Sequence, residues 1–287
     1  MTAIESLLAE LIDYAGLYPP AALDMHTAVR KYLEYSNGAH RRALGRFVID
    51  LARFPYLWDA AGDYVRGLRL TVIAAPGADW SEVHRLIDKG YVIESIEIKP
   101  GAPEEITAIA NQLPAGLTAY FEVPFDAAPK WFHAVEASGG RIKLRMGGIA
   151  AEAFPSPQSV AAMLEELAHR RLVFKATAGL HHAVRGRHAV DCAVGGRPGG
   201  STAVMHGFIN LACAAALLYF GAEADDARQA LEEEWPRSWQ MTPEALMWGE
   251  YSWNGDELGE VRRQFFAGFG SCSFQEPIEE LEAMGWL

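Results

Sequence analysis

The chain has 287 residues, of which 50% are hydrophobic and 22% charged, and its formal net charge is −12 at pH 7. This composition is typical of a globular protein and excludes a disordered or collagen-like chain. The strongly negative charge repels nucleic acid, so we expect no nucleic-acid partner. The length is compatible with one α/β barrel.

The cysteines and the apolar segments indicate a compartment. Cys192, Cys213 and Cys272 form no CxxC pair, which argues against a disulfide framework and a zinc ribbon. Acidic residues such as Glu5 interrupt the apolar N-terminal stretch, so we predict no secretory signal. The longest apolar run, Met205–Phe220, is shorter than the roughly 20 residues that a membrane span needs. We therefore expect a cytoplasmic protein with no membrane partner.

Short β-rich segments alternate with amphipathic helical segments through the first two thirds of the chain. The predicted strands cover residues 46–50, 68–74, 92–99, 117–125, 141–146 and 171–177. The predicted helices cover residues 81–89, 103–112, 127–138 and 156–170. This alternation implies parallel strands joined by right-handed crossovers. We predict an α/β fold, a single (β/α)8 TIM-type barrel over residues 1–287, with an N-terminal helix and loop in residues 1–45.

The C-terminal third is less regular. Helices are predicted at 205–220 and 224–234, a hairpin at 242–254, and a segment at 261–274 that leads into a final helix at 276–284. We expect the last two barrel strands to come from this region and to be irregular. An open doubly wound sheet is the competing architecture. We favour the barrel because it brings the polar ends of successive strands to one point.

Ionisable side chains follow one face of four consecutive predicted strands. They are Glu97, Lys99, Glu122, Lys143, Arg145 and Lys175. Side chains alternate across a strand, so these residues share a face opposite an apolar one. Charges inside a barrel need pairing, hydrogen bonds or substrate, and such barrels keep their active sites at the carboxyl-terminal mouth. The alternative is a set of buried salt bridges with a purely architectural role.

Lys175 is the sharpest single candidate for chemistry. It lies between Phe174 and Ala176 and near Lys143 and Arg145. We predict that burial and like charge lower the pKa of Lys175, which makes the amine available as a nucleophile or a general base. The alternative is a lysine that pairs with Glu122 and stays protonated.

The run Lys175-Ala176-Thr177-Ala178-Gly179 follows a basic strand and a helix. The stretch 142–180 resembles the fifth and sixth strands of class I aldolases of the deoxyribose-phosphate aldolase group, where the lysine of a Lys-Thr-Ser-Thr-Gly strand forms a Schiff base. The resemblance implies a barrel with a Schiff-base lysine at Lys175, and Thr177 joins the predicted substrate-binding residues. The sequence departs from the group at Leu180-His181-His182, and no second, pKa-lowering lysine is located on a seventh strand, although Lys143 is a substitute.

His181 and His182 follow the sixth predicted strand. An imidazole titrates near pH 6.5, so we predict that one of the two acts as a general acid or base, the alternative being a solvated basic loop. A metal site would need one of them together with His206, Glu122 or Glu97 from other segments. The sequence contains no HxH or HExxH chelate, so we predict no bound metal and no cofactor.

The segment Gly268–Glu276 has small residues before a predicted helix. Free backbone N–H groups there, with Ser271 and Ser273, are predicted to hold a carboxylate or phosphate. The alternative is an ordinary helix start in which Ser273 and Glu276 form a capping box.

Together these features predict an enzyme, a lyase of aldolase type or an isomerase, that acts on a small polar, anionic carbonyl compound. Lys175 is the predicted nucleophile or base, Glu122 moves a proton, and His181 or His182 makes the second proton transfer. The predicted substrate-binding residues are Glu97, Lys99, Lys143, Arg145, Thr177, Ser271 and Ser273. Two alternatives stay open: a metal-dependent hydrolase or lyase with histidine and glutamate ligands, and a non-catalytic barrel that binds an anion. We expect a small-molecule substrate as partner, and a homo-oligomer remains compatible with the sequence.

Overall fold

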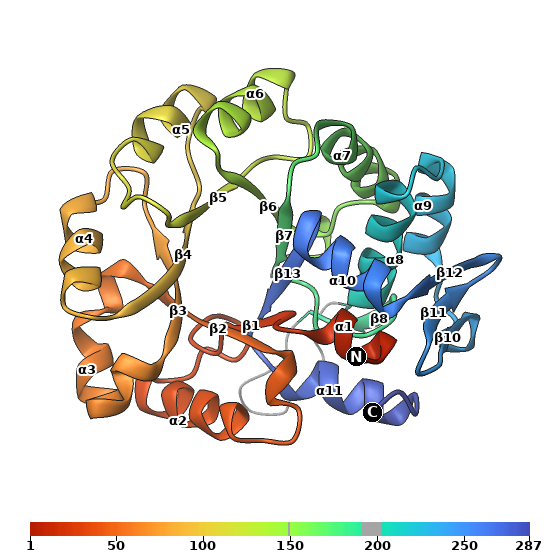
Figure 1. Cartoon of the computed structure of the whole chain (residues 1–287), viewed down its shortest axis with the longest axis horizontal. Helices are drawn as coiled ribbons and strands as arrows, with labels where there is room; N and C mark the ends of the chain where they lie inside the picture. The colour runs from red at the N-terminus through yellow and green to blue at the C-terminus, as the bar shows by residue number, and fades with distance from the viewer. Residues whose placement is uncertain (149, 191–201) are drawn as a thin grey trace.

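The computed structural model describes residues 1–148, 150–190 and 202–287. Parallel strands close into one barrel in the order β1-β13-β7-β6-β5-β4-β3-β2, and helices surround it (Figure 1). The barrel strands are β1 (Ile12–Tyr14), β2 (Leu44–Asp50), β3 (Arg69–Ala74), β4 (Val92–Ile98), β5 (Thr118–Glu122), β6 (Arg141–Arg145), β7 (Phe174–Thr177) and β13 (Phe266–Ser271). This closed eight-stranded ring confirms the predicted (β/α)8 barrel.

The helices are α1 (Ala3–Leu8), α2 (Met25–Ser36), α3 (Pro55–Ala61), α4 (Trp80–Asp88), α5 (Pro103–Ala110), α6 (Pro129–Ser138), α7 (Pro157–Arg170), α8 (Phe208–Tyr219), α9 (Ala224–Glu232), α10 (Gly255–Gln264) and α11 (Gln275–Ala283). The helices that were predicted with bounds, α4 to α9 and α11, begin and end within three residues of the prediction, whereas α2, α3 and α10 were not predicted. Local chemistry sets these bounds. In α7, the Ser156 side chain accepts a hydrogen bond from the Ser159 N–H, Pro157 occupies the first turn, and Arg171 ends the helix in a left-handed conformation.

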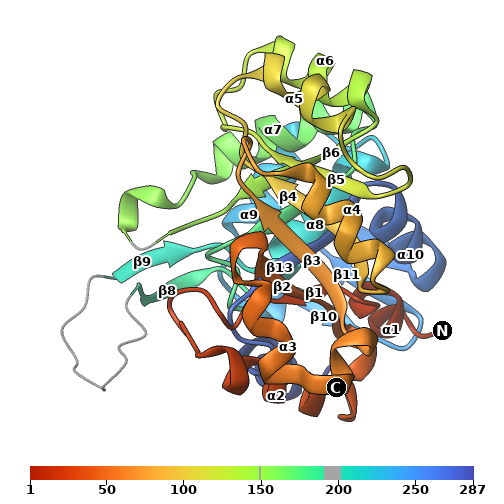
Figure 2. The ribbon, with the colours of Figure 1, turned by 90° about the vertical axis from the view of Figure 1, so that its left-hand side faces the viewer.

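In the described part of the chain, two small β elements lie outside the barrel. The hairpin β8 (Gly186–Ala189)–β9 (Thr202–Met205) extends away from the barrel (Figure 2). The antiparallel sheet β10 (Trp239–Met241), β11 (Ala245–Trp248) and β12 (Tyr251–Asn254) contains the hairpin predicted at 242–254. Helix α8 is buried along most of its length, as its apolar run predicts. Within the described ranges, no helix is long and apolar enough to cross a membrane.

The barrel does not close as the sequence predicted. Both missing strands were expected in the C-terminal third, but only β13 comes from there. The other is β1, which pairs with β13 on one side and β2 on the other and lies in the segment predicted as a helix and loop. The reason is its length: β1 has 3 residues, too few to show the alternation by which a strand is recognised.

A buried arginine holds these two strands in place. Arg262 on α10 is 8% exposed, and its guanidinium donates to the carbonyl oxygens of Leu7 (2.9 Å), Ala9 (2.9 Å) and Phe266 (2.6 Å). Burial lowers the pKa of Arg262 to about 10, so the side chain stays protonated at neutral pH. One cation thus connects the turn before β1 to the start of β13.

The change Arg262→Met is expected to lower the free energy of unfolding by about 3 kcal/mol, because it leaves three buried carbonyl groups without donors. Urea denaturation followed by circular dichroism measures the loss. Arg263→Met, at the exposed neighbouring position, is the control and is expected to change stability by less than about 0.5 kcal/mol. Equal effects of the two changes would contradict this role for Arg262.

Candidate active site at the barrel mouth

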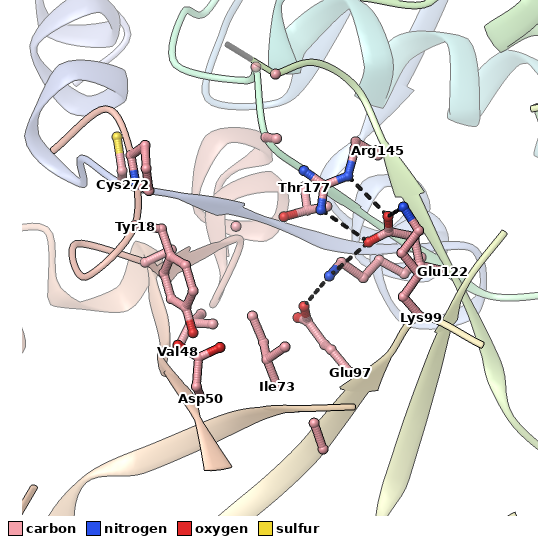
Figure 3. Close-up of a pocket in the computed structure, with 18 of the residues that line it drawn as sticks. Tyr18, Val48, Asp50, Ile73, Glu97, Lys99, Glu122, Arg145, Thr177 and Cys272 are labelled. Atoms are coloured by element: carbon pink, nitrogen blue, oxygen red, sulfur yellow. Dashed lines mark hydrogen bonds and ion pairs between the residues drawn. The ribbon is translucent and has the colours of Figure 1, made fainter. Parts of the chain in front are cut away.

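A cavity of about 1240 Å³ opens at the carboxyl-terminal ends of the barrel strands. Several strands contribute side chains to its wall. These include Asp50 from β2, Ile73 from β3, Glu97 from β4, Glu122 from β5, Arg145 from β6 and Thr177 from β7 (Figure 3). Lys143 from β6 also lines it. This is the position at which such barrels hold their active sites.

The polar face of the predicted strands does point into the barrel. Strand register places Lys143 between Glu122 on β5 and Lys175 on β7. Glu97, Lys99, Glu122, Lys143 and Arg145 line the mouth cavity. Lys175 does not: it lies one layer deeper and lines a second cavity of about 60 Å³ beneath the charged layer.

The buried charges form one continuous chain of ion pairs. Lys175 Nζ lies 2.6 Å from Asp13 Oδ2 and 2.5 Å from Glu97 Oε1. Lys143 Nζ lies 2.8 Å from Glu97 Oε2 and 3.2 Å from Glu122 Oε2. All five residues are at most 6% exposed. Acidic and basic groups therefore alternate in the order Asp13–Lys175–Glu97–Lys143–Glu122, and each buried charge has an opposite neighbour.

Two further cations meet the upper end of this chain. Arg145 Nε lies 3.0 Å from Glu122 Oε1, and Lys99 Nζ lies 3.4 Å from the same oxygen (Figure 3). The Lys99 side chain is 73% exposed and that of Arg145 is 48% exposed. Glu122 thus receives three cations, of which two are accessible from the cavity.

These contacts set the protonation states of the acids. Burial by itself raises the pKa of Glu97, but Lys143 and Lys175 outweigh it and lower that pKa to about 2. Burial likewise opposes ionisation of Glu122, but Lys143 and Arg145 outweigh it and leave its pKa below the ordinary value. Both acids are carboxylates at neutral pH.

The expected lowered pKa of Lys175 is wrong. Burial does lower it, but Asp13 and Glu97 outweigh burial and hold the pKa well above the usual range. Asp13 lies on β1, 162 positions away in sequence, so local sequence reasoning missed it. The alternative partner considered from the sequence, Glu122, pairs with Lys143, Lys99 and Arg145 instead.

Both predicted histidines line the cavity, on the wall formed by the loop after β7. His182 Nδ1 lies 2.6 Å from Glu280 Oε1 on α11. Burial, and to a lesser degree the neighbouring His182, lowers the pKa of His181 to about 4. His181 is therefore a neutral imidazole and a weak base at pH 7.

The structure also brings Cys272 to this wall. Cys272 Sγ lies 3.8 Å from His181 Nδ1, and Glu276 Oε2 lies 3.6 Å from the same nitrogen. The two partners of the thiol–imidazole contact are 91 positions apart. No local motif signals such a contact.

The predicted anion-binding turn lies at the mouth, because Gly270 and Cys272 line the cavity. Its hydroxyl groups already have partners, one of them outside the turn, because Ser271 Oγ lies 3.4 Å from His181 Nδ1. Ser271 Oγ accepts from the Ser273 N–H (3.3 Å), and Ser273 Oγ accepts from the Glu276 N–H (3.1 Å). The second contact is half of the capping box considered above. Anion binding by this turn stays a prediction.

Close backbone contact shapes the loop on the far side of the mouth. Gly179 has φ +70°, and a Cβ there would lie 2.9 Å from the Gly147 Cα. A larger residue would therefore push apart the loops that follow β6 and β7. The ring of Phe154 lies against both glycines and lines the cavity.

Among the described residues, no group of three or more histidine, cysteine, aspartate or glutamate side chains is placed to hold a metal ion. Cys192, noted in the sequence, lies outside the described residues.

Fold and mouth together define a (β/α)8 barrel with a charged cavity at the carboxyl ends of its strands. Among solved structures, the chain is similar to a deoxyribose phosphate aldolase from Aeropyrum pernix, reported as a unique tetrameric structure. The match has 16% identity and a TM-score of 0.45, and covers 62% of this chain and 80% of that one. The aldolase group named from the sequence thus recurs among structural matches. No protein family matches the chain, and no curated protein matches it.

The change Glu97→Gln tests the ion-pair chain. Because the pKa of Glu97 is lowered from 4.5 to about 2, its stabilising contribution is fully present above about pH 4.5 and is lost as pH falls toward 2. That contribution is about 3 kcal/mol. We expect the variant to be less stable by about this amount at pH 7 and to show a flatter stability curve between pH 5 and 2.

Urea unfolding across this pH range measures both effects. Glu244→Gln, at an exposed position, is the control and is expected to follow the unaltered protein. A Glu97→Gln curve parallel to that of the unaltered protein would show that Glu97 is not a strongly stabilised carboxylate.

Proposed function

We propose that the protein is an enzyme that acts on a small, negatively charged carbonyl compound by aldolase-type lyase or isomerase chemistry. One observation carries the proposal. The Lys143 ammonium lies in the cavity wall between Glu97 (2.8 Å) and Glu122 (3.2 Å), and two accessible cations, Arg145 and Lys99, adjoin the same glutamate. An amine, a proton acceptor and an anion-binding pair are therefore within reach of one ligand.

The anionic group of the substrate pairs with Arg145 and Lys99. Both side chains reach the cavity, and both already contact a carboxylate. A guanidinium binds a carboxylate or phosphate through two parallel hydrogen bonds, which fixes the orientation of the ligand as well as its charge. The carbonyl group then lies toward Lys143.

Substrate binding also changes the basicity of Glu122. Arg145 contributes to the lowered pKa of Glu122, so an anion that draws Arg145 away raises that pKa toward its ordinary value. Glu122 is then better able to accept a proton from the Lys143 ammonium.

The covalent step follows from this proton transfer. The Lys143 amine adds to the carbonyl carbon and forms a C–N bond. The oxygen leaves as water after taking up two protons, one from the amine and one returned by Glu122. The product is an iminium ion, which withdraws electrons from the neighbouring carbon and permits C–C cleavage or proton transfer there. His181 or His182, on the loop after β7, makes the second proton transfer.

Lys175 takes a positioning role in this scheme. Its ammonium is held by Asp13 (2.6 Å) and Glu97 (2.5 Å), and its raised pKa keeps it protonated. It orients Glu97, which in turn contacts Lys143. The nucleophilic role predicted for Lys175 from the sequence is the competing assignment, and the next experiment separates the two.

Borohydride reduction in the presence of 2-oxo acids and phosphorylated aldehydes is expected to add covalent mass to the peptide that contains Lys143. Lys143→Met should abolish the adduct and lower turnover by about 10³-fold or more. Lys175→Met should slow adduct formation without abolishing it. Lys130→Met, at an exposed position, is the control. An adduct on the Lys175 peptide would reverse the assignment, and no adduct with any carbonyl would remove Schiff-base chemistry.

Arg145→Met is expected to raise KM for an anionic carbonyl substrate about tenfold or more, because it removes a charged hydrogen-bond donor. It should also raise the pKa of Glu122, since Arg145 lowers it. The acidic limb of the kcat/KM profile, which reports ionisation of the base, should therefore move to higher pH. Arg30→Met, on an exposed helix face, is the control; an unmoved acidic limb in Arg145→Met would remove Glu122 as the base.

A further inference from the structure

The mouth cavity has a charged half and an apolar half. The buried ion pairs of the mouth lie on β4 to β6. On β2 and β3, the inward positions at the mouth are occupied by Val48 and Ile73, which face the ion pairs across the opening (Figure 3). Ile73 is directly beside Glu97 in the strand register, so the change from charged to apolar occurs between two adjacent strands.

The loops beyond these strands continue the apolar wall. After β2 it includes Leu51, Ala52 and Pro55, and after β3 it includes Ala75, Pro76 and Ala78. The charged groups in this half are paired with one another: Asp50 Oδ2 lies 3.2 Å from Arg53 Nε, and Arg85 Nη2 lies 3.3 Å from Asp79 Oδ2 and 2.6 Å from Glu82 Oε2. The charges among these apolar side chains are therefore already balanced.

A second apolar wall lies beyond the opposite edge of the mouth. Met205, at the base of the β8–β9 hairpin, and Val190, directly after β8, are 4% and 7% exposed, and Phe154 packs against them. All three line the cavity. The close contact of Gly147 with Gly179 places the Phe154 ring there.

The barrel also leaves space between the two halves. Gly270 on β13 is beside Asp13 on one side and Thr177 on the other in the strand register. A Cβ at Gly270 would make only an ordinary contact, 3.5 Å from Thr177 Oγ1, so β13 leaves open space at this position. The volume of about 1240 Å³ exceeds the roughly 300–1,000 Å³ of most ligand pockets.

We infer that the substrate is amphiphilic: a carbonyl-bearing carboxylate with an apolar chain, of the class of medium-chain 2-oxo acids. Its charged end meets Arg145 and Lys99, and its chain lies over Val48 and Ile73. A small hydrophilic ligand would leave the apolar walls in contact with water. The inference rests on the proposed function for the reacting end of the ligand and on the apolar walls for the rest.

The affinity for a chain-length series tests this inference. The probes are pyruvate, 2-oxobutanoate, 2-oxohexanoate and 2-oxooctanoate, titrated into the protein by calorimetry at one pH and salt concentration. Each methylene buried on the apolar wall should lower Kd about fourfold, until the wall is covered. A Kd that does not fall along the series overturns the inference, as does tighter binding of glyceraldehyde 3-phosphate than of 2-oxooctanoate.

Matched variants test where the apolar chain of the ligand lies. Ile73→Asn places an amide in the apolar wall and should reduce the ratio of the pyruvate Kd to the 2-oxooctanoate Kd at least tenfold. Val92→Asn makes the same kind of change at the far end of β4, outside the cavity, and should leave the ratio unchanged. Phe154→Ala tests the second wall if Ile73→Asn fails to fold, as judged by thermal denaturation. If the ratio of the pyruvate Kd to the 2-oxooctanoate Kd is unchanged in both Ile73→Asn and Phe154→Ala, the apolar chain of the ligand does not lie on these walls.

Failure of the function and failure of this inference give different results. Turnover of short carbonyl compounds without a chain-length gain overturns the inference and leaves the proposed function standing. A chain-length gain without turnover or a borohydride adduct overturns the proposed function and supports the ligand class. No binding by any member of the series overturns both.

Discussion

The structure depends on a chain of buried ion pairs in the barrel interior. Removing a carboxylate or an ammonium from water costs several kcal/mol unless an opposite charge replaces the lost hydration. Here each interior charge of the chain, from Asp13 to Glu122, contacts an opposite one. Because the partners come from β1, β4, β5, β6 and β7, the same contacts that stabilise the charges also hold these strands in register around the barrel.

The series of ion pairs differs at its two ends: the lower end is enclosed, and the upper end is accessible to a ligand. At the lower end, Lys175 is enclosed between two acids and does not reach the mouth cavity. At the upper end, Glu122 contacts three cations, and two of them, Arg145 and Lys99, are accessible. An interior that balanced its charges completely would have no reason to bind an anion. The accessible Arg145 and Lys99 beside Glu122 provide one, even though the whole protein carries a net charge of −12.

Charge also divides the mouth by strand. Strands β4 to β6 present the ion-paired groups Glu97, Glu122 and Lys143, whereas β2 and β3 present Val48 and Ile73 beside Asp50. The loop after β6 and the base of the β8–β9 hairpin add Phe154 and Met205. A cavity built in this way discriminates between ligands by two independent terms: electrostatic attraction for one end and removal of apolar surface from water for the other. The proposed chemistry needs only the first term, and the proposed ligand class follows from the second.

The sequence by itself determined the barrel class, the bounds of most helices, and the inward-facing row of Glu97, Glu122 and Lys143, because strand alternation and helix capping depend on neighbours within a few positions. Only the tertiary structure decided which charge meets which. Asp13 lies on a strand of 3 residues, 162 positions from Lys175 in the sequence, and with Glu97 it raises the pKa of Lys175, which was expected to be lowered. His181 and Cys272, which are in contact, are 91 positions apart. Electrostatic energies depend on distances in space, and these distances are set by barrel closure rather than by local pattern.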